Sequence, residues 1–177
     1  MTSADVETRI RAVVRDIADF PTPGILFKDI TPVLAQPALL RAAVAAMSSP
    51  YDRAGVTHVA GIESRGFLFG VPIALALNCA FVPVRKPGKL PFDRVSEAYV
   101  LEYRSDTLEI HSDAFGSGAR VLVVDDVLAT GGTAAAASRL VERLGGHVVA
   151  VSVLLELEQL GGRLRLESRT VHAVTRY

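Results

Sequence analysis

The chain has 177 residues, of which 50% are hydrophobic and 21% are charged, and this size and composition predict one globular domain over residues 1–177. Its 19 basic side chains balance 19 acidic ones, which argues against the broad basic surface that most nucleic-acid-binding proteins carry. The single cysteine excludes an internal disulfide, residues 1–20 lack the apolar stretch of a signal peptide, and no apolar run approaches the ~20 residues of a membrane span. We therefore expect a cytoplasmic protein that binds neither nucleic acid nor membrane.

The first half of the chain is expected to alternate helices and strands. Apolar residues at helical spacing predict an amphipathic helix over residues 4–18, and the prolines that follow interrupt it. A second helix is expected to begin at Pro37, a residue suited to a first helical turn. A buried strand is expected over 57–62, a deeply packed helix over 66–77 and another strand over 81–84.

The second half begins with a segment of different character. Residues 85–113 carry many charges and turn-forming residues, which predict a basic loop and then a polar hairpin that turns near residues 104–106. The later elements are a strand over 120–127, a helix over 133–144, a strand over 148–155 and a short terminal strand. Because strands that alternate with helices form parallel sheets covered on both faces, we predict an α/β fold.

The most informative motif is Val-Leu-Val-Val-Asp-Asp-Val-Leu-Ala-Thr-Gly-Gly-Thr at residues 121–133. Four apolar residues lead into Asp125 and Asp126, and a glycine-rich turn then opens a helix. Carboxylates at a strand end can hold sugar hydroxyls, and free backbone N–H groups at a helix start bind phosphate. Paired acids alone usually only end a strand, but with this turn behind them they indicate a site for a ribose phosphate.

Two further segments place cations in loops. Arg65 follows a predicted strand, and its planar guanidinium suits phosphate oxygens, although this loop alone is a weak signal. The Arg85–Pro91 segment has three cations in five positions, a pattern that is usually a solvated surface. A substrate that loses pyrophosphate would give such fixed cations a partner, so we favour a role in binding the leaving group.

The irregular segment Phe20–Pro32 is open to two interpretations. Its apolar side chains, Phe27 among them, either complete the core or sandwich a flat base whose edge the backbone amides read. The residues alone do not decide between the two.

Taken together, these segments resemble the type I phosphoribosyltransferases and, among them, the adenine phosphoribosyltransferases. The motif at 121–133 is similar to the family's signature for phosphoribosyl pyrophosphate (PRPP), and the resemblance covers residues 16–166. The other matching segments are Asp19–Pro32, Gly61–Phe67, Arg85–Pro91, Leu101–Tyr103 and Asp106–His111.

The resemblance implies a fold and a reaction. The fold is a parallel sheet flanked by helices, with a small N-terminal hood at about 16–34 and a flexible loop at about 87–111 that excludes water. The reaction is transfer of the phosphoribosyl group of PRPP to N9 of adenine, giving AMP and pyrophosphate, with Mg²⁺ held mainly through PRPP rather than directly by the protein. The family works as a homodimer in which the basic loop of one subunit serves the other's site.

The resemblance also implies residue roles. The PRPP-binding residues would be Ser64, Arg65, Arg85, Lys86, Lys89, Asp125, Asp126, Ala129, Thr130, Gly131, Gly132 and Thr133. The adenine-binding residues would be Leu26, Phe27 and Lys28, with the strand end at Glu156 and Leu157 completing the pocket. The catalytic residues would be Glu102, Tyr103, Arg65 and Lys86, with Glu102 a candidate for managing the proton of the base.

The chain departs from the usual family pattern at three positions. Ser64 stands in place of an alanine, Lys28 in place of an arginine and Arg104 in place of a glycine. A positive φ at residue 104 would strain an arginine, so the loop is expected to close differently there.

Other functions that use PRPP stay open at this point. A phosphoribosyltransferase for guanine, hypoxanthine or xanthine would need a base-binding segment different from Phe20–Pro32. A PRPP-sensing regulator would be expected to carry a helix-turn-helix or a basic face, and a PRPP synthase would need an ATP site. Neither the length nor the zero net charge favours the regulator.

Overall fold

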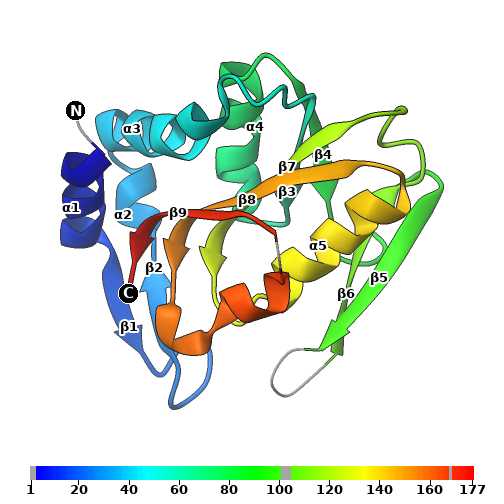
Figure 1. Cartoon of the computed structure of the whole chain (residues 1–177). Helices are drawn as coiled ribbons and strands as arrows, with labels where there is room; N and C mark the ends of the chain where they lie inside the picture. The colour runs from blue at the N-terminus through cyan, green and yellow to red at the C-terminus, as the bar shows by residue number, and fades with distance from the viewer. Residues whose placement is uncertain (1–2, 101–104, 168) are drawn as a thin grey trace.

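A computed structural model describes residues 3–100, 105–167 and 169–177 of the chain (Figure 1). Its centre is a five-stranded sheet in the order β4-β3-β7-β8-β9, in which every neighbouring pair is parallel. The strands are β3 (His58–Ile62), β4 (Ala80–Val84), β7 (Arg120–Leu128), β8 (His147–Glu156) and β9 (Val171–Arg176). The predicted parallel α/β sheet is confirmed.

Helices cover both faces of this sheet (Figure 1). One face is covered by α1 (Ser3–Val13), α2 (Thr31–Leu34), α3 (Pro37–Ser48) and α4 (Gly66–Ala76), and the other by α5 (Gly132–Arg143) and the hairpin of β5 (Arg94–Val100) and β6 (Ser105–His111). A separate hairpin is formed by β1 (Arg15–Ala18) and β2 (Leu26–Asp29), and the 3-10 turns are η1 (Ser49–Tyr51), η2 (Glu158–Leu160) and η3 (Gly162–Leu166). None of the described helices is long and apolar enough to cross a membrane.

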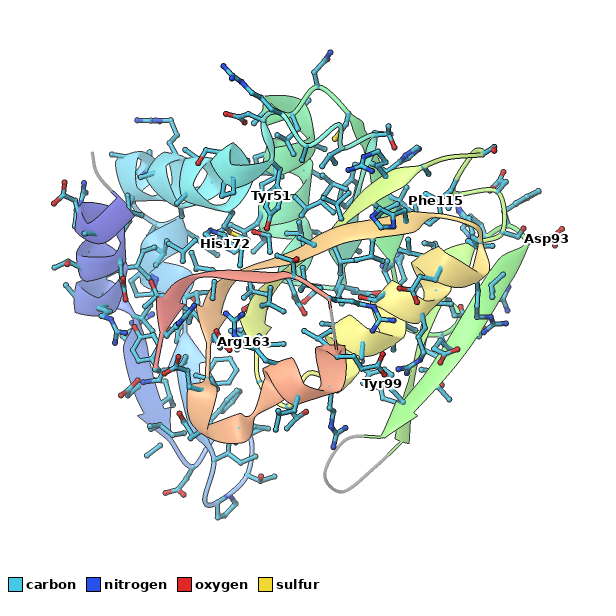
Figure 2. All side chains as sticks on the ribbon, viewed as in Figure 1. Tyr51, Asp93, Tyr99, Phe115, Arg163 and His172 are labelled. Carbon is cyan, nitrogen blue, oxygen red and sulfur yellow. The ribbon has the colours of Figure 1, made fainter. Side chains whose placement is uncertain are left out.

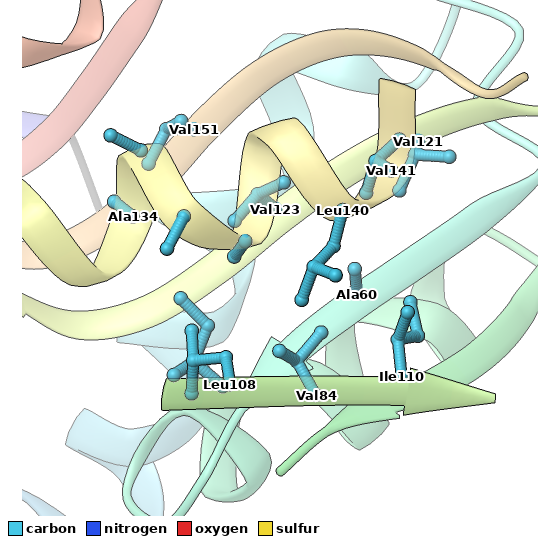
Figure 3. Close-up of a cluster of buried hydrophobic side chains, with 14 of the residues drawn as sticks. Ala60, Val84, Leu108, Ile110, Val121, Val123, Ala134, Leu140, Val141 and Val151 are labelled. Atoms are coloured by element: carbon cyan, nitrogen blue, oxygen red, sulfur yellow. The ribbon is translucent and has the colours of Figure 1, made fainter. Parts of the chain in front are cut away.

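The central strand β7 is buried on both faces, which explains its unbroken apolar run. Val121 and Val123 belong to the cluster under α5, whereas Leu122 and Val124 pack on the side of α3 and α4. Figure 3 shows the first of these clusters, where Leu140 of α5 lies over the sheet. A strand buried on both faces has a continuous run of hydrophobic residues rather than an alternation of apolar and polar ones. In β7 this run leads directly to Asp125 and Asp126.

The first predicted helix is wrong in its C-terminal part. α1 ends at Val13, and Arg15–Ala18 forms β1 instead. β1 pairs antiparallel with β2, placing Ile17 opposite Phe27. The helical spacing of apolar residues does continue to Ile17, but the backbone bonds to β2 decide the conformation there.

Two other expectations need correction. α4 is not packed on all sides, because Leu68, Val71 and Leu75 are exposed along one stripe. The hairpin after residue 85 is present, but Ser105 and Asp106, where the turn was expected, already belong to β6. Arg104, the other residue of the expected turn, lies outside the described residues. Nor is the hairpin polar throughout, since one of its faces is buried beneath α5. The flexibility expected of residues 87–111 stays a prediction.

Candidate active site

One cavity of about 710 Å³ gathers most of the residues that the sequence singled out. It opens beside the carboxyl ends of β3 and β7, where ligands of parallel sheets bind. The predicted site residues that line it are Leu26, Phe27, Lys28, Ser64, Arg65, Lys86, Asp125, Asp126, Ala129, Thr130, Thr133 and Leu157. Segments that are more than a hundred residues apart in the chain therefore share one space.

The two acids lie within β7, which continues to Leu128. Asp126 is 4% exposed, and its Oδ2 lies 2.9 Å from Nε of Arg65. This ion pair is not aligned as a hydrogen bond, so the buried oxygen lacks a hydrogen-bond donor. Oδ1 of Asp125 accepts a bond of 2.9 Å from the backbone N of Asp126. The acids are thus held at the cavity wall with acceptor capacity to spare.

Burial changes the protonation of both acids. Burial, together with the neighbouring Asp126 carboxylate, raises the pKa of Asp125 well above its usual range. Burial also raises the pKa of Asp126, although the Arg65 guanidinium opposes this rise. In the free site the carboxylate forms of both acids are therefore disfavoured. A ligand with hydroxyl donors, or a cation, would stabilise them.

The turn after β7 is shaped by close contact with a second glycine turn. Gly131 has φ +81°, and a Cβ built there would lie 2.2 Å from the carbonyl oxygen of Gly162. No side chain caps α5 at this end. The first backbone N–H groups of a helix have no partners within the helix and favour an anion. Thr130 and Thr133 line the cavity at this place, so the turn is suited to a phosphate.

The base-binding segment forms an apolar wall opposite the acids. Phe27 packs edge-on against Phe20 with ring centroids 5.1 Å apart. The guanidinium carbon of Arg65 lies 4.8 Å from the Phe27 ring centroid. Arg65 therefore spans the cavity from the Phe27 ring to Asp126. Leu26, 51% exposed, leaves apolar surface open at the cavity.

Lys28 lines the cavity, but its ammonium is engaged elsewhere. Nζ donates to Oδ1 of Asp16 at 2.6 Å and lies 4.0 Å from the Tyr177 ring centroid. Glu156 is buried and does not line the cavity, because both of its carboxylate oxygens accept bonds from Arg163, which Figure 2 labels. Of the two predicted residues Lys28 and Glu156, only Lys28 therefore lines the candidate base pocket.

The basic segment is held by acids. The guanidinium of Arg85 donates to both carboxylate oxygens of Glu63, at 3.1 and 3.2 Å, and to the carbonyl of Lys89 at 3.1 Å. Glu63 also accepts a bond of 2.9 Å from the backbone N of Lys86. Lys86 alone among the three cations of this segment lines the cavity.

Some predicted residues lie outside the cavity wall. Gly131 and Gly132 form the turn behind Thr130 and Thr133, and Arg85 bonds Glu63 and the backbone carbonyl of Lys89. Glu102, Tyr103 and Arg104 lie outside the described residues. Their catalytic and loop-closing roles stay predictions.

Three residues that contribute to the site were missed from the sequence. Glu63 lies at the cavity and orients the basic segment, and Tyr99 and Asp106 bond the Lys86 ammonium. Glu63 had a usable signal. It follows β3 just as Arg85 follows β4, and in a parallel pair with Ile62 opposite Val84 the next two residues are neighbours.

Known proteins share this chain's sequence and fold. The phosphoribosyl transferase domain family matches residues 30–171. The adenine phosphoribosyltransferase of Myxococcus xanthus is 58% identical over 166 residues, which cover 94% of this chain and 90% of the relative. The crystal structure of adenine phosphoribosyltransferase from Rhodothermus marinus has a TM-score of 0.94 at 51% identity, covering 98% of this chain and 99% of that one.

A third relative was crystallised with ligands. The adenine phosphoribosyltransferase of Saccharomyces cerevisiae, in complex with adenine and an imino-altritol bisphosphate, has a TM-score of 0.91 at 38% identity, covering 97% of this chain and 99% of that one. Both sequence and fold therefore agree over almost the whole chain. The chain belongs to the phosphoribosyl transferase family and, within it, to the adenine phosphoribosyltransferases.

Proposed function

We propose that the cavity beside Asp125 and Asp126 is the active site in which this chain transfers the phosphoribosyl group of PRPP to adenine, giving AMP and pyrophosphate. The observation that carries the proposal is the meeting of four kinds of group in one space. These are paired acids, a turn suited to phosphate, the cations Arg65 and Lys86, and an apolar wall. The family membership agrees with that chemistry.

Each part of the cavity has a task in this reaction. Asp125 and Asp126 hold the ribose hydroxyls, and the turn at residues 129–133 holds the 5′-phosphate. Adenine lies against Phe27 in the apolar wall. Arg65 and Lys86 then face the departing pyrophosphate. The protein's contribution is to position both substrates and to stabilise the leaving charge.

We propose Mg²⁺ as the divalent cation of the reaction. Among the described residues no group of three or more His, Cys, Asp or Glu side chains could hold a metal ion. Mg²⁺ commonly keeps several waters and binds through the phosphates of its substrate, and Asp125 and Asp126 are assigned to the ribose hydroxyls, so the ion would be held mainly through PRPP. Bound in that way, it would neutralise charge on the pyrophosphate and improve the leaving group.

The choice of base is tested by turnover. Purified protein with PRPP and Mg²⁺ is expected to form AMP from adenine and no nucleotide from guanine, hypoxanthine or xanthine. Chromatographic separation of the products measures this directly. Faster turnover of guanine than of adenine would overturn the base assignment. We also place the enzyme in the cytoplasm, because a chain whose single cysteine forms no internal disulfide fits a reducing compartment.

We propose further that the enzyme works as a homodimer and that α4 contributes to the interface. Leu68, Val71 and Leu75 repeat at positions three and four residues apart and form one apolar stripe. Leu75 is 77% exposed, although Phe69, Ile73 and Ala74 of the same helix pack in the core. A second copy of the chain would remove this stripe from water.

A charge placed on the α4 stripe tests the dimer. Leu75→Lys is expected to shift the protein from dimer to monomer at micromolar concentration, because burying an unpaired ammonium is strongly unfavourable. Leu164→Lys is the matched control, since Leu164 is also a single exposed leucine, at 85%, but lies in η3. Sedimentation velocity measures both variants. A dimer that persists in Leu75→Lys would exclude α4 from the interface.

A further inference from the structure

Two hairpin residues with no assigned role hold the Lys86 ammonium. Nζ of Lys86 lies 3.0 Å from Oη of Tyr99 and also donates to the carboxylate of Asp106. Oη of Tyr99 in turn donates to Oδ2 of Asp106 at 3.2 Å. The three side chains therefore form a closed triangle of polar contacts between the basic segment and the β5–β6 hairpin.

The hairpin supplies two members of this triangle from one packed face. Tyr99 and Asp106 are directly opposite each other in the antiparallel pair, so their side chains lie on the same face. Tyr99 is only 5% exposed and belongs to the core cluster under α5, which fixes its ring. The Asp106 side chain is 19% exposed. Such an anchored pair can hold a lysine more firmly than solvent or a mobile side chain could.

The arrangement leaves the lysine able to bind a further anion. An ammonium group has three N–H donors, and the two hairpin residues occupy two of them. Burial lowers the pKa of Lys86, but the bonds to Asp106 and Tyr99 outweigh this effect and raise it. Lys86 lines the cavity and thus presents a fixed, charged donor near the candidate pyrophosphate site.

We propose that Tyr99 and Asp106 are positioning residues, which hold the Lys86 ammonium ready for the pyrophosphate group of PRPP. This proposal rests on the function proposed above. The hairpin would then act on the reaction through Lys86, by fixing the place of the cation that meets the leaving group.

The test is a kinetic double-mutant cycle with Mg²⁺ and varied PRPP. Asp106→Asn is expected to lower kcat/KM for PRPP about tenfold, which is the lower end of the range expected when a hydrogen bond between charged groups is lost. KM for adenine should stay within about twofold of the wild-type value. Lys86→Met should lower it further. Adding Asp106→Asn to Lys86→Met should then change nothing more, because the residue that Asp106 positions is already gone.

Control variants separate positioning from a purely structural role. Asp93→Asn removes an exposed carboxylate just before β5, and Figure 2 shows Asp93 and Tyr99 at opposite ends of that strand, so this variant should keep the wild-type kinetics. Tyr99→Phe removes only a hydroxyl group and should lower kcat/KM for PRPP about threefold. It keeps the test valid if Asp106→Asn folds poorly.

The outcomes distinguish this inference from the function on which it rests. A wild-type enzyme that forms no AMP would remove the proposed function itself. An active wild type in which Asp106→Asn and Tyr99→Phe have wild-type kinetics would overturn the positioning role. Equal losses from Asp106→Asn in the presence and absence of Lys86 would also overturn it, because Asp106 would then act independently of the lysine.

Discussion

Replacing Asp125 with asparagine is expected to lower kcat/KM for PRPP by about 10- to 100-fold and, at the same time, to raise the melting temperature of the free protein. The loss of activity follows because a charged acceptor for a ribose hydroxyl is removed, and bonds to charged groups contribute about 1.5–3 kcal/mol each. Steady-state kinetics with varied PRPP measure the first effect, and calorimetry without ligand measures the second.

The gain in stability follows from the raised pKa of Asp125. Burial and the Asp126 carboxylate disfavour the charged form of Asp125 in the folded protein. Asparagine is neutral and can still accept the bond from the backbone N of residue 126. Each unit of pKa corresponds to about 1.4 kcal/mol, and about 1 kcal/mol changes Tm by about 2–4 °C in a chain of this size.

The stability difference between wild type and Asp125→Asn should depend on pH. The folded-state pKa lies above the ordinary value of 3.8, so the folded protein binds more protons and wild-type stability falls as pH rises above that value. Wild type and Asp125→Asn should therefore melt alike near pH 3–4 and diverge as pH rises toward 7. The exposed Asp113 supplies the control, since Asp113→Asn should change neither activity nor Tm. A lower Tm for Asp125→Asn at pH 7 would contradict the account.

The central motif could be predicted from the sequence because its structure is local. The apolar run, the acids, the glycine turn and α5 follow one another in the chain, and each step has its own residue signal. The contact that holds the Lys86 ammonium carried no such signal. The bond between Lys86 and Asp106 joins residues 20 positions apart, and the sequence shows only two charges in a polar region.

Tertiary context also explains where the predicted elements failed. Arg15–Ala18 continues the helical spacing of α1, yet pairing with β2 draws it into a strand beside the candidate base site. The composition of α4 predicts complete burial, but one stripe of it remains exposed in the single chain. The proposed dimer would reconcile that stripe with its sequence.

The largest combined loss of stability and activity is expected from Gly131→Ala. Its left-handed φ of +81° costs about 1–2 kcal/mol for an alanine. The new methyl group would also stand 2.2 Å from the carbonyl oxygen of Gly162, so the two turns would have to separate, at about 1–3 kcal/mol more. That separation would displace the phosphate-binding turn, and an error of about 1 Å in position can lower a rate about 100-fold.

Gly145 provides a control at the opposite end of the same helix. It has nearly the same φ, +78°, but a Cβ built there meets nothing within 4 Å. Gly145→Ala should therefore lose only the free energy of unfolding that the left-handed φ costs an alanine, and it should keep the wild-type kcat/KM for PRPP. Gly131→Ala should melt at a lower temperature than Gly145→Ala and should lose about 100-fold in kcat/KM. Equal losses in both variants would show that φ alone matters and that contact between the two glycine turns does not shape the phosphate site.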